Sequence, residues 1–360
     1  QNHGVFVAAD SMEEINRLYD GIKAAITQSI EKLPVQENLA LSPLLTEVVP
    51  AARMMFSEGK LKVARAFHNR CIAPFIADKN TFEGICTPYT PDQMVYCLSE
   101  YLFIENNSTP ESVIDEIKEK ATEFRRRKGA YPKVVFIRNE GVIVLEDSPV
   151  ALEYLVGLVL DFTQIAGLSE NFGGPHPMTP DQIAFIENWE VENYRKKVSL
   201  GGKPLGRVEN KIVVITGAAQ GFGAGIAGMM FEEGANIVVA DLNEDKGNEF
   251  VETLNGSGKK NRAFFVKVNV ADAPSVEEMV CKSVLHFGGL DVLISNAGIL
   301  RAGGLEEMTP ETFNLMTRVN YNAYFHCVKY AAAVMKIQHR HNPSLFMDII
   351  QINSKSGLKG

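Results

Sequence analysis

The chain has 360 residues, enough for two or three domains, and its 46% hydrophobic and 22% charged residues exclude a wholly disordered protein. The formal net charge of -8 argues against a nucleic-acid partner, which would need a basic surface. The apolar runs, such as residues 151–162, are too short to span a bilayer, so we expect no membrane partner. The five cysteines form no C-x-x-C pair, so we expect reduced thiols in a cytoplasmic protein.

From both ends of the sequence we expect the chain to be a fragment of a longer protein. It starts at Gln1 directly on a strand-like run, and it stops in the loop-like residues 356–360. The strand-like run covers residues 4–8. A helix follows it, with Ser11 as the predicted N-cap and Glu14 completing a capping box. Its apolar positions recur at helical spacing.

Residues 2–11 are repeated later in the chain. They align without gaps with residues 139–148, six of the ten positions are identical, and an apolar helix follows each segment. This similarity predicts two related modules in which His3 and Glu140 are equivalent. Two unrelated strand–turn–helix units with similar turn chemistry are the alternative.

Between and after the two similar segments the sequence is mixed. We expect residues 38–85 to be mainly helical and partly exposed, and residues 109–127 to form a charged helix. Thr179 is expected to cap a helix that runs to about Arg195, and residues 201–207 form a linker rich in Gly and Pro. Beyond the linker, β and α patterns alternate, which is typical of a parallel sheet covered on both faces.

A glycine-rich turn follows the first strand of this second half. The strand, residues 211–215, leads into residues 216–223, which read Thr-Gly-Ala-Ala-Gln-Gly-Phe-Gly and open a helix. Gly217 would allow a sharp turn, Gly221 would let backbone approach a pyrophosphate, and Gly223 would let the helix pack on the sheet. The helix N-terminus would offer N–H groups to the phosphates.

The next predicted strand ends in Asp241, where a carboxylate can accept both ribose hydroxyls of NAD. A 2′-phosphate at that place would meet its negative charge, and the nearest downstream base, Lys246, is expected to face away. These residues predict binding of NAD rather than NADP. A glycine-rich turn with an unrelated Asp is the alternative.

Further motifs complete a family pattern. The Thr-Gly-x-x-x-Gly-x-Gly turn, Asp241, Asn296-Ala297-Gly298 and Asn320 together resemble the short-chain dehydrogenase/reductase family over residues 208–360. The resemblance implies that Asn320 anchors a water in a proton relay and that Ser354 hydrogen-bonds the substrate oxygen. Asn269 departs from the pattern, because the family usually has Asp there. The cofactor-binding residues that the resemblance implies are Gly217, Gln220, Gly221, Phe222, Gly223, Asp241, Leu242, Asn269, Val270, Asn296, Ala297 and Gly298.

The family's Tyr-x-x-x-Lys pair is expected about a dozen residues after Ser354, and the chain stops before that point. In the family this Tyr is the general acid/base and the Lys lowers its pKa and binds the ribose. The fragment is therefore expected to bind a nucleotide but not to turn over.

The first residues resemble the end of a class II aldolase/adducin module, in which His3 matches the last of three metal ligands, usually zinc. The other ligands of that module are absent, and a catalytic zinc takes three protein ligands, so we expect no bound zinc here and zinc only in a full-length aldolase module. Residues 1–200 would then be the end of one module plus a second, degenerate module over about 86–200. The order of parts resembles bifunctional class II aldolase/short-chain dehydrogenases.

The predicted fold class is α/β: a C-terminal Rossmann-type doubly wound parallel sheet over residues 208–360, preceded by the α+β aldolase-like region. The leading function is NAD-dependent oxidoreduction of a sugar, polyol or aldehyde, and the family resemblance favours a homo-oligomer. A metal-dependent sugar-phosphate aldolase in the full-length protein and a non-catalytic nucleotide-binding module are the alternatives. The substrate is not specified by this sequence.

Overall fold

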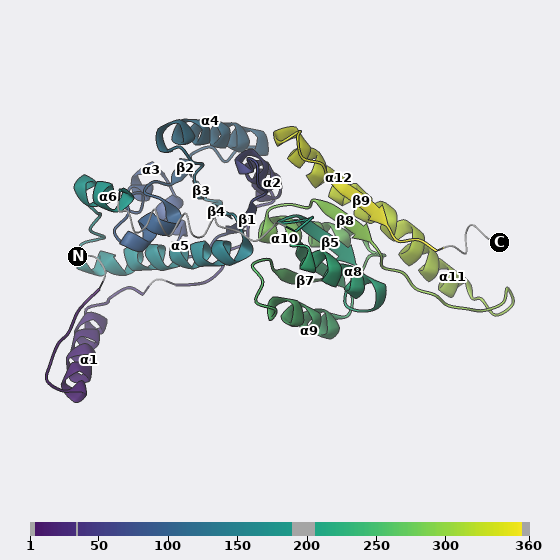
Figure 1. The fold of residues 1–360 in the computed structure, drawn as a ribbon, viewed down its shortest axis with the longest axis horizontal. Helices are drawn as coiled ribbons and strands as arrows, with labels where there is room; N and C mark the ends of the chain where they lie inside the picture. Colours follow the sequence, from purple (N-terminus) through teal and green to yellow (C-terminus); the bar gives the residue numbers. More distant parts are fainter. Residues whose placement is uncertain (1–3, 34, 189–205, 355–360) are drawn as a thin grey trace.

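The structure is a computed structural model and describes residues 4–33, 35–188 and 206–354. Two sheets form the body of the molecule, one in each half of the chain (Figure 1). Helix α1 (Met12–Gln28) extends away from both sheets and buries none of its residues.

The first sheet has four strands in the order β1-β4-β3-β2. Strand β4 is antiparallel to both of its neighbours, and β2 is parallel to β3. Every residue of β2, β3 and β4 is buried, because α2 and α4 cover one face of the sheet and α5 covers the other. The strands are β1 (Val63–Phe67), β2 (Leu102–Ile104), β3 (Val134–Ile137) and β4 (Gly141–Glu146). The helices of this half are α2 (Leu45–Phe56), η1 (Ala73–Ile76), α3 (Lys79–Phe82), η2 (Gln93–Cys97), α4 (Pro110–Lys128), α5 (Pro149–Ser169), η3 (Glu170–Phe172) and α6 (Pro180–Glu187).

The second sheet has five parallel strands in the order β7-β6-β5-β8-β9. Its order reverses at β5, which is the arrangement of a doubly wound α/β sheet and confirms the predicted Rossmann-type fold. The strands are β5 (Ile212–Thr216), β6 (Asn236–Asp241), β7 (Ala263–Lys267), β8 (Val292–Ser295) and β9 (Asp348–Gln351). The helices are α8 (Gly221–Glu232), α9 (Glu244–Asn255), α10 (Ala273–Phe287), α11 (Pro310–Thr317), η4 (Arg318–Asn322) and α12 (Ala323–His341).

One buried apolar cluster joins the two halves. It contains residues of α2, α4 and β1 together with residues of β5, α10 and α12, so the two sheets share a core. Within it, the guanidinium of Arg53 on α2 donates to both carboxylate oxygens of Asp291, just before β8, at 2.9 and 2.7 Å. The exposed fraction of the Arg53 side chain is 0%. Of the predicted linker 201–207, residues 201–205 lie outside the part that the structure describes.

The N-terminal half departs from the sequence expectations at two places. Residues 4–8 form no strand, because no described strand lies beside them to accept their hydrogen bonds. Residues 38–85 contain the helices α2, η1 and α3 and are partly exposed, as expected, but they also contain the strand β1, and α2 is deeply buried. By contrast, the helices capped by Thr109 and Thr179 form as expected, although the predicted continuation toward Arg195 lies outside the described residues.

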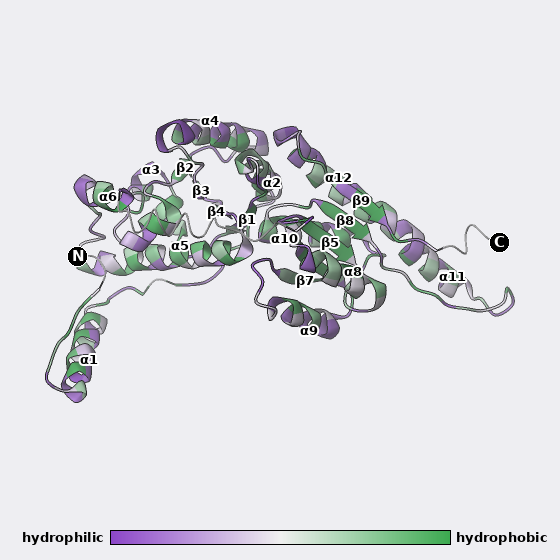
Figure 2. Cartoon of the chain, viewed as in Figure 1, coloured by the Kyte–Doolittle hydropathy of each residue, from purple (hydrophilic) through white to green (hydrophobic). Residues whose placement is uncertain are grey.

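Helix α5 is the most apolar long helix in Figure 2, and residues 149–172 are long and apolar enough to cross a membrane by length and composition. The expectation that its apolar run is too short for that is therefore wrong. One face of α5, including Leu152, Leu155 and Val159, packs in the buried core beneath the first sheet. That packing is typical of the core helix of a folded domain, and the absence of a membrane partner stays a prediction.

Candidate functional site

The carboxyl ends of the parallel strands bring most of the predicted site residues to one edge of the second sheet. The glycine turn follows β5, Asp241 ends β6, Asn269 and Val270 follow β7, and Asn296 follows β8. Ligands bind at this edge in open α/β sheets, next to the point where strand order reverses. Ser354 lies at the same edge, after β9, and its N–H donates to the side chain of Asn353.

At two glycines of the turn, an added side chain would clash with neighbouring backbone. Gly217 has a φ of +67°, and a Cβ there would lie 2.9 Å from the Cα of Ala297. A Cβ on Gly223 would lie 2.1 Å from the carbonyl oxygen of Gly217. The chain therefore turns sharply off β5 and packs α8 closely on the strand, for the reasons that the sequence predicted.

Around Gly221 the surface is open, because a Cβ built there would meet no atom within 4 Å. The side chain of Gln220, the N-cap residue of α8, makes no capping hydrogen bond. The first-turn N–H groups of α8 are thus not occupied by a cap and point to a free surface, where phosphate oxygens could accept from them. Phe222, in the same turn, is largely exposed.

Asp241 connects the glycine turn to the end of β6. Its Oδ2 accepts from the N–H of Ala219 at 3.0 Å, and its Oδ1 accepts from the N–H of Asn243 at 2.9 Å. A carboxylate has about four lone-pair sites, so each oxygen can still accept a ribose hydroxyl. Leu242 is exposed beside it.

Lys246 does not face away from this edge, contrary to the sequence expectation. It lies in the first turn of α9, and its Nζ donates to Oε1 of Gln220 at 2.8 Å. This contact is not predictable from a local pattern, because it joins the first turn of α9 to the separate turn after β5. It places an ammonium group on the glycine turn.

Two asparagines hold the loop after β8. The side-chain amide of Asn296 donates to the carbonyl oxygens of Thr216 and Gly217, at 3.0 and 3.2 Å, and so ties β8 to the glycine turn. The Asn320 side chain accepts from the N–H of Ile299 at 2.9 Å and donates to its carbonyl oxygen at 2.8 Å. Asn320 lies in the π-helical turn η4, a local widening that is frequent at functional sites. Both amides position backbone next to Ala297 and Gly298.

After β7 the chain forms a tight turn that is held by hydrogen bonds of Asn269. The Asn269 side chain accepts from the N–H of Ala271 at 3.1 Å, and its own N–H donates to Ser275 Oγ at 3.0 Å. Val270 is buried, and its carbonyl oxygen lies 3.4 Å from Nδ1 of His326. In this structure Asn269 therefore shapes the turn before α10.

The part of the N-terminal half that the structure describes holds little that resembles a metal centre. His3 lies outside the described residues, and no group of three or more His, Cys, Asp or Glu side chains within the described ranges could hold a metal ion. Glu140, the residue aligned with His3, lies in the turn before β4 near His68. Burial lowers the pKa of His68 below its ordinary value, and Glu140 opposes that shift. The sequence analysis did not identify His68 as a neighbour of Glu140.

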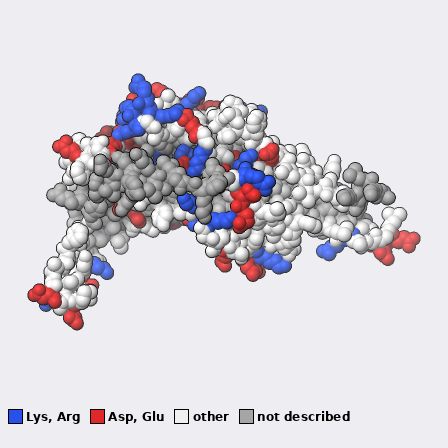
Figure 3. All heavy atoms as spheres, in the orientation of Figure 1, with Lys and Arg blue, Asp and Glu red and all other residues white. Residues whose placement is uncertain are grey.

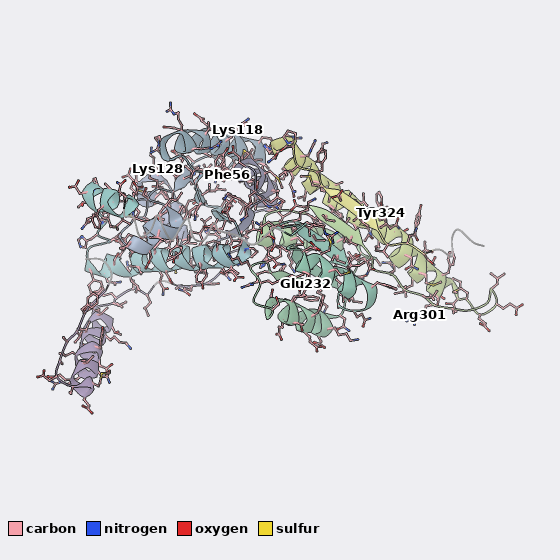
Figure 4. The ribbon with its side chains drawn as sticks, viewed as in Figure 1. Phe56, Lys118, Lys128, Glu232, Arg301 and Tyr324 are labelled. Carbon is pink, nitrogen blue, oxygen red and sulfur yellow. The ribbon has the colours of Figure 1, made fainter. Side chains whose placement is uncertain are left out.

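A hollow of about 520 Å³ lies between η2, the end of α4 and α6. All of its described lining residues belong to the N-terminal half of the sequence, which does not contain the glycine turn. Figure 3 shows Lys and Arg gathered over the end of α4, and Figure 4 labels Lys128 among them. Lys128 pairs with Glu187 at 3.2 Å, and Arg127 pairs with Glu100 at 2.8 Å. The charged groups that line the hollow thus satisfy one another.

Residues 211–360 match the family model described as short chain dehydrogenase. A 2,5-dichloro-2,5-cyclohexadiene-1,4-diol dehydrogenase of Sphingobium indicum is 38% identical over 152 residues, which cover 42% of this chain and 58% of the relative. A trans-4-hydroxycyclohexanecarboxylate dehydrogenase of Sinomonas cyclohexanicum is 36% identical over 159 residues, covering 43% and 58%. An uncharacterized oxidoreductase of Bacillus subtilis, YuxG, is 28% identical over 162 residues, covering 45% and 23%. The match thus spans less than two thirds of each of these relatives.

Proposed function

We propose that the half of the chain that matches the short chain dehydrogenase family binds NAD and takes part in hydride transfer. The substrate would be an alcohol or the matching carbonyl compound. The observation that carries the proposal is the edge where the glycine turn, Asp241 and Asn296 meet. Free first-turn N–H groups of α8 lie beside a carboxylate that can bind ribose.

The residues at this edge would have separate roles. The first turn of α8 would hold the pyrophosphate, and Asp241 would accept the adenosine ribose hydroxyls. NAD, when bound, supplies the hydride acceptor. Asn296 and Asn320 keep the loop after β8 in place, and Ser354 at the end of β9 would orient the substrate oxygen by a hydrogen bond.

Binding, not turnover, is the appropriate assay for this chain. The resemblance assigns proton transfer to a Tyr-x-x-x-Lys pair, and residues 355–360 do not contain one. We expect the 360-residue chain to reduce ketoses or aldehydes far more slowly than a chain that includes the pair, since a positioned acid/base group contributes on the order of 10²–10⁴ in rate. Comparable rates from the two chains would contradict this expectation.

For the substrate we propose a sugar, polyol or aldehyde. A second class comes from the names of two relatives, which specify a cyclohexadiene diol and a hydroxycyclohexanecarboxylate. Activity of a longer chain on cyclic alcohols and not on sugars would favour this second class. Both would use the same cofactor edge.

Titration of NAD onto the chain by calorimetry tests the binding proposal. Asp241→Ala removes two ribose hydrogen bonds at about 1 kcal/mol each, which corresponds to roughly 30-fold weaker NAD binding. Asp245→Ala, a change of the same kind in the first turn of α9, should leave NAD affinity within about twofold. Absence of NAD binding by the unaltered chain, or equal losses in the two variants, would reject the proposal.

The aldolase-like origin of the N-terminal half stays a proposal. It rests on the sequence resemblance of the first residues to the end of a class II aldolase/adducin module and on the similarity of residues 2–11 to residues 139–148. Zinc would bind only where three ligands meet, so metal analysis of the dialysed chain should find no stoichiometric zinc. About one tightly held zinc ion per chain would overturn this expectation.

A further inference from the structure

The buried apolar side chains of the described residues form three clusters, and the largest of them belongs to both halves of the chain. One cluster is made by the first half and fills the space between the first sheet and α5. A second is made by the second half and lies between the second sheet, α8 and α9. The third contains side chains from the other face of each sheet together with α2, α4, α10 and α12. The facing sides of the two sheets therefore share one core.

A shared layer of helices lies between the two sheets (Figure 1). Helix α10 of the second half packs against β1 of the first sheet, and α2 of the first half packs against both α10 and α12. Each half thus buries apolar surface against elements of the other half. Either half alone would expose that surface to water, which is unfavourable.

The shared layer also holds a buried polar network that crosses between the halves. The guanidinium of Arg53 on α2 donates to Asp291 Oδ2 at 2.7 Å, and the same oxygen accepts from the N–H of Ile212, the first residue of β5, at 2.8 Å. The side chain of Gln338 on α12 donates to Asp291 Oδ1 at 2.8 Å. Separation of the halves would leave this carboxylate without its cation, which is strongly unfavourable for a buried charge.

The backbones of the two halves approach closely at the turn after α10. Gly288 has a φ of +100°, and a Cβ there would lie 2.7 Å from the Cβ of Ala64 on β1. Just before β5, the side-chain amide of Asn210 donates to the carbonyl oxygen of Asp147 at 2.6 Å. These contacts lie at the amino ends of β5 and β8, whereas the glycine turn lies at the carboxyl ends. The first half therefore contacts the second sheet at the edge opposite to the proposed cofactor site.

We propose that the N-terminal half is an integral support of the nucleotide-binding half, so that the two halves unfold together as one cooperative unit. A nucleotide bound at the cofactor edge then stabilises the first sheet as well as the second. The physical reason is that opening either half exposes the shared layer and breaks the Arg53–Asp291 pair. Two domains that meet only through a surface contact would instead open separately. The nucleotide part of this inference rests on the proposed function, and the cooperative unit does not.

Hydrogen exchange followed by mass spectrometry reads the two sheets separately in the intact 360-residue chain. Peptides that cover β3 and β4 report on the first sheet, and peptides that cover β5 and β8 report on the second. Ile237→Val removes one methyl group from the cluster made by the second half alone, where the residue is fully buried. We expect the slowest-exchanging amides of both sheets to exchange about two- to tenfold faster, by the same factor.

Ile76→Val is the reciprocal variant, because Ile76 is fully buried in the cluster made by the first half alone. It should accelerate exchange in both sheets by a common factor in the same range. Met229→Ala is the control. This residue lies on α8 with 72% of its surface exposed, so neither sheet should respond. Both isoleucine changes are conservative, so the variants are expected to remain folded.

NAD provides the ligand test. At 100 times its dissociation constant, a ligand that binds only the folded state slows exchange through global unfolding about 100-fold, and we expect this factor in both sheets. Acceleration confined to the substituted half in Ile237→Val and Ile76→Val would overturn the cooperative unit, as would protection by NAD confined to the second sheet. If both isoleucine variants affect both sheets but NAD protects neither, the proposed function fails and the cooperative unit stands.

Discussion

The two similar segments of the N-terminal half have the same local backbone and very different surroundings. Gly4 and Gly141 have φ angles of +128° and +125°. Ser11 and Ser148 are both extended N-cap residues, and the side chain of each accepts a hydrogen bond from the N–H three residues further on. Yet Gly141 begins a buried strand between β1 and β3, whereas residues 4–8 form no strand.

The helices that follow differ in the same way. Helix α5 has seven buried residues, whereas α1 has none. Gly4 and Gly141 therefore occupy different topological positions, which does not support two complete, equivalent modules in residues 4–188; His3 itself lies outside the described residues. The comparison teaches that caps and turns follow from local sequence, while strand formation and burial need a partner surface. Matched substitutions in the two segments and their surroundings test this difference.

The largest difference is expected for arginines in ion pairs. Arg53→Ala leaves the buried carboxylate of Asp291 without its cation, and we expect a loss of about 3–5 kcal/mol in the free energy of unfolding. Arg17→Ala breaks an exposed pair with Glu14 on α1 and should cost less than about 0.5 kcal/mol. Denaturant unfolding measures both. Similar losses in the two variants would mean that α1 is packed as tightly as α2.

The next difference concerns Leu18 and Leu155, which are separated by the same number of residues as the two similar segments. Leu155→Ala opens a cavity in the core beneath the first sheet, where the residue is 1% exposed, and should cost about 2–5 kcal/mol. Leu18→Ala changes a residue that is 40% exposed on α1 and should cost less than about 0.5 kcal/mol. The same unfolding measurement applies, and a large effect at Leu18 would show that α1 packs on a surface in solution.

The two glycines should differ by a smaller amount. In Gly141→Ala the new Cβ would lie 2.7 Å from the carbonyl oxygen of Phe67, in addition to the strain of a positive φ, so we expect a cost of roughly 1–3 kcal/mol. A Cβ at Gly4 would meet nothing within 4 Å, and residues 4–8 belong to no sheet, so global unfolding should be unaffected by Gly4→Ala. Equal destabilisation would indicate that Gly4 is also in a sheet.

The smallest difference concerns the caps. Ser148→Ala removes the side-chain acceptor for the N–H of Ala151 and should lower the free energy of unfolding by about 1 kcal/mol. Ser11→Ala should reduce the helix content of α1 on circular dichroism without shifting the global unfolding midpoint, because α1 is not part of the packed core. A shift of the midpoint in Ser11→Ala comparable to that in Ser148→Ala would contradict this separation.

Features that depend on residues close together in the chain could be predicted from the amino-acid sequence. The glycine turn, the helices capped by Thr109 and Thr179, and the alternation that builds the parallel sheet were predicted because each arises from residues a few positions apart. The meeting of Asp241 and Asn296 at one edge follows from the same pattern, since the carboxyl ends of parallel strands lie together.

Contacts between segments that are distant in the chain could not be predicted in this way. Arg53 and Asp291 are 238 positions apart, and no local pattern relates them. Strand β1 was missed because its burial depends on β4 and α10, and residues 4–8 were wrongly predicted as a strand because the same residue types form one only beside a partner. Lys246 was assigned to the wrong face because the reach of a long side chain depends on how two loops are placed. Contacts between distant segments follow from packing, which a local sequence pattern does not encode.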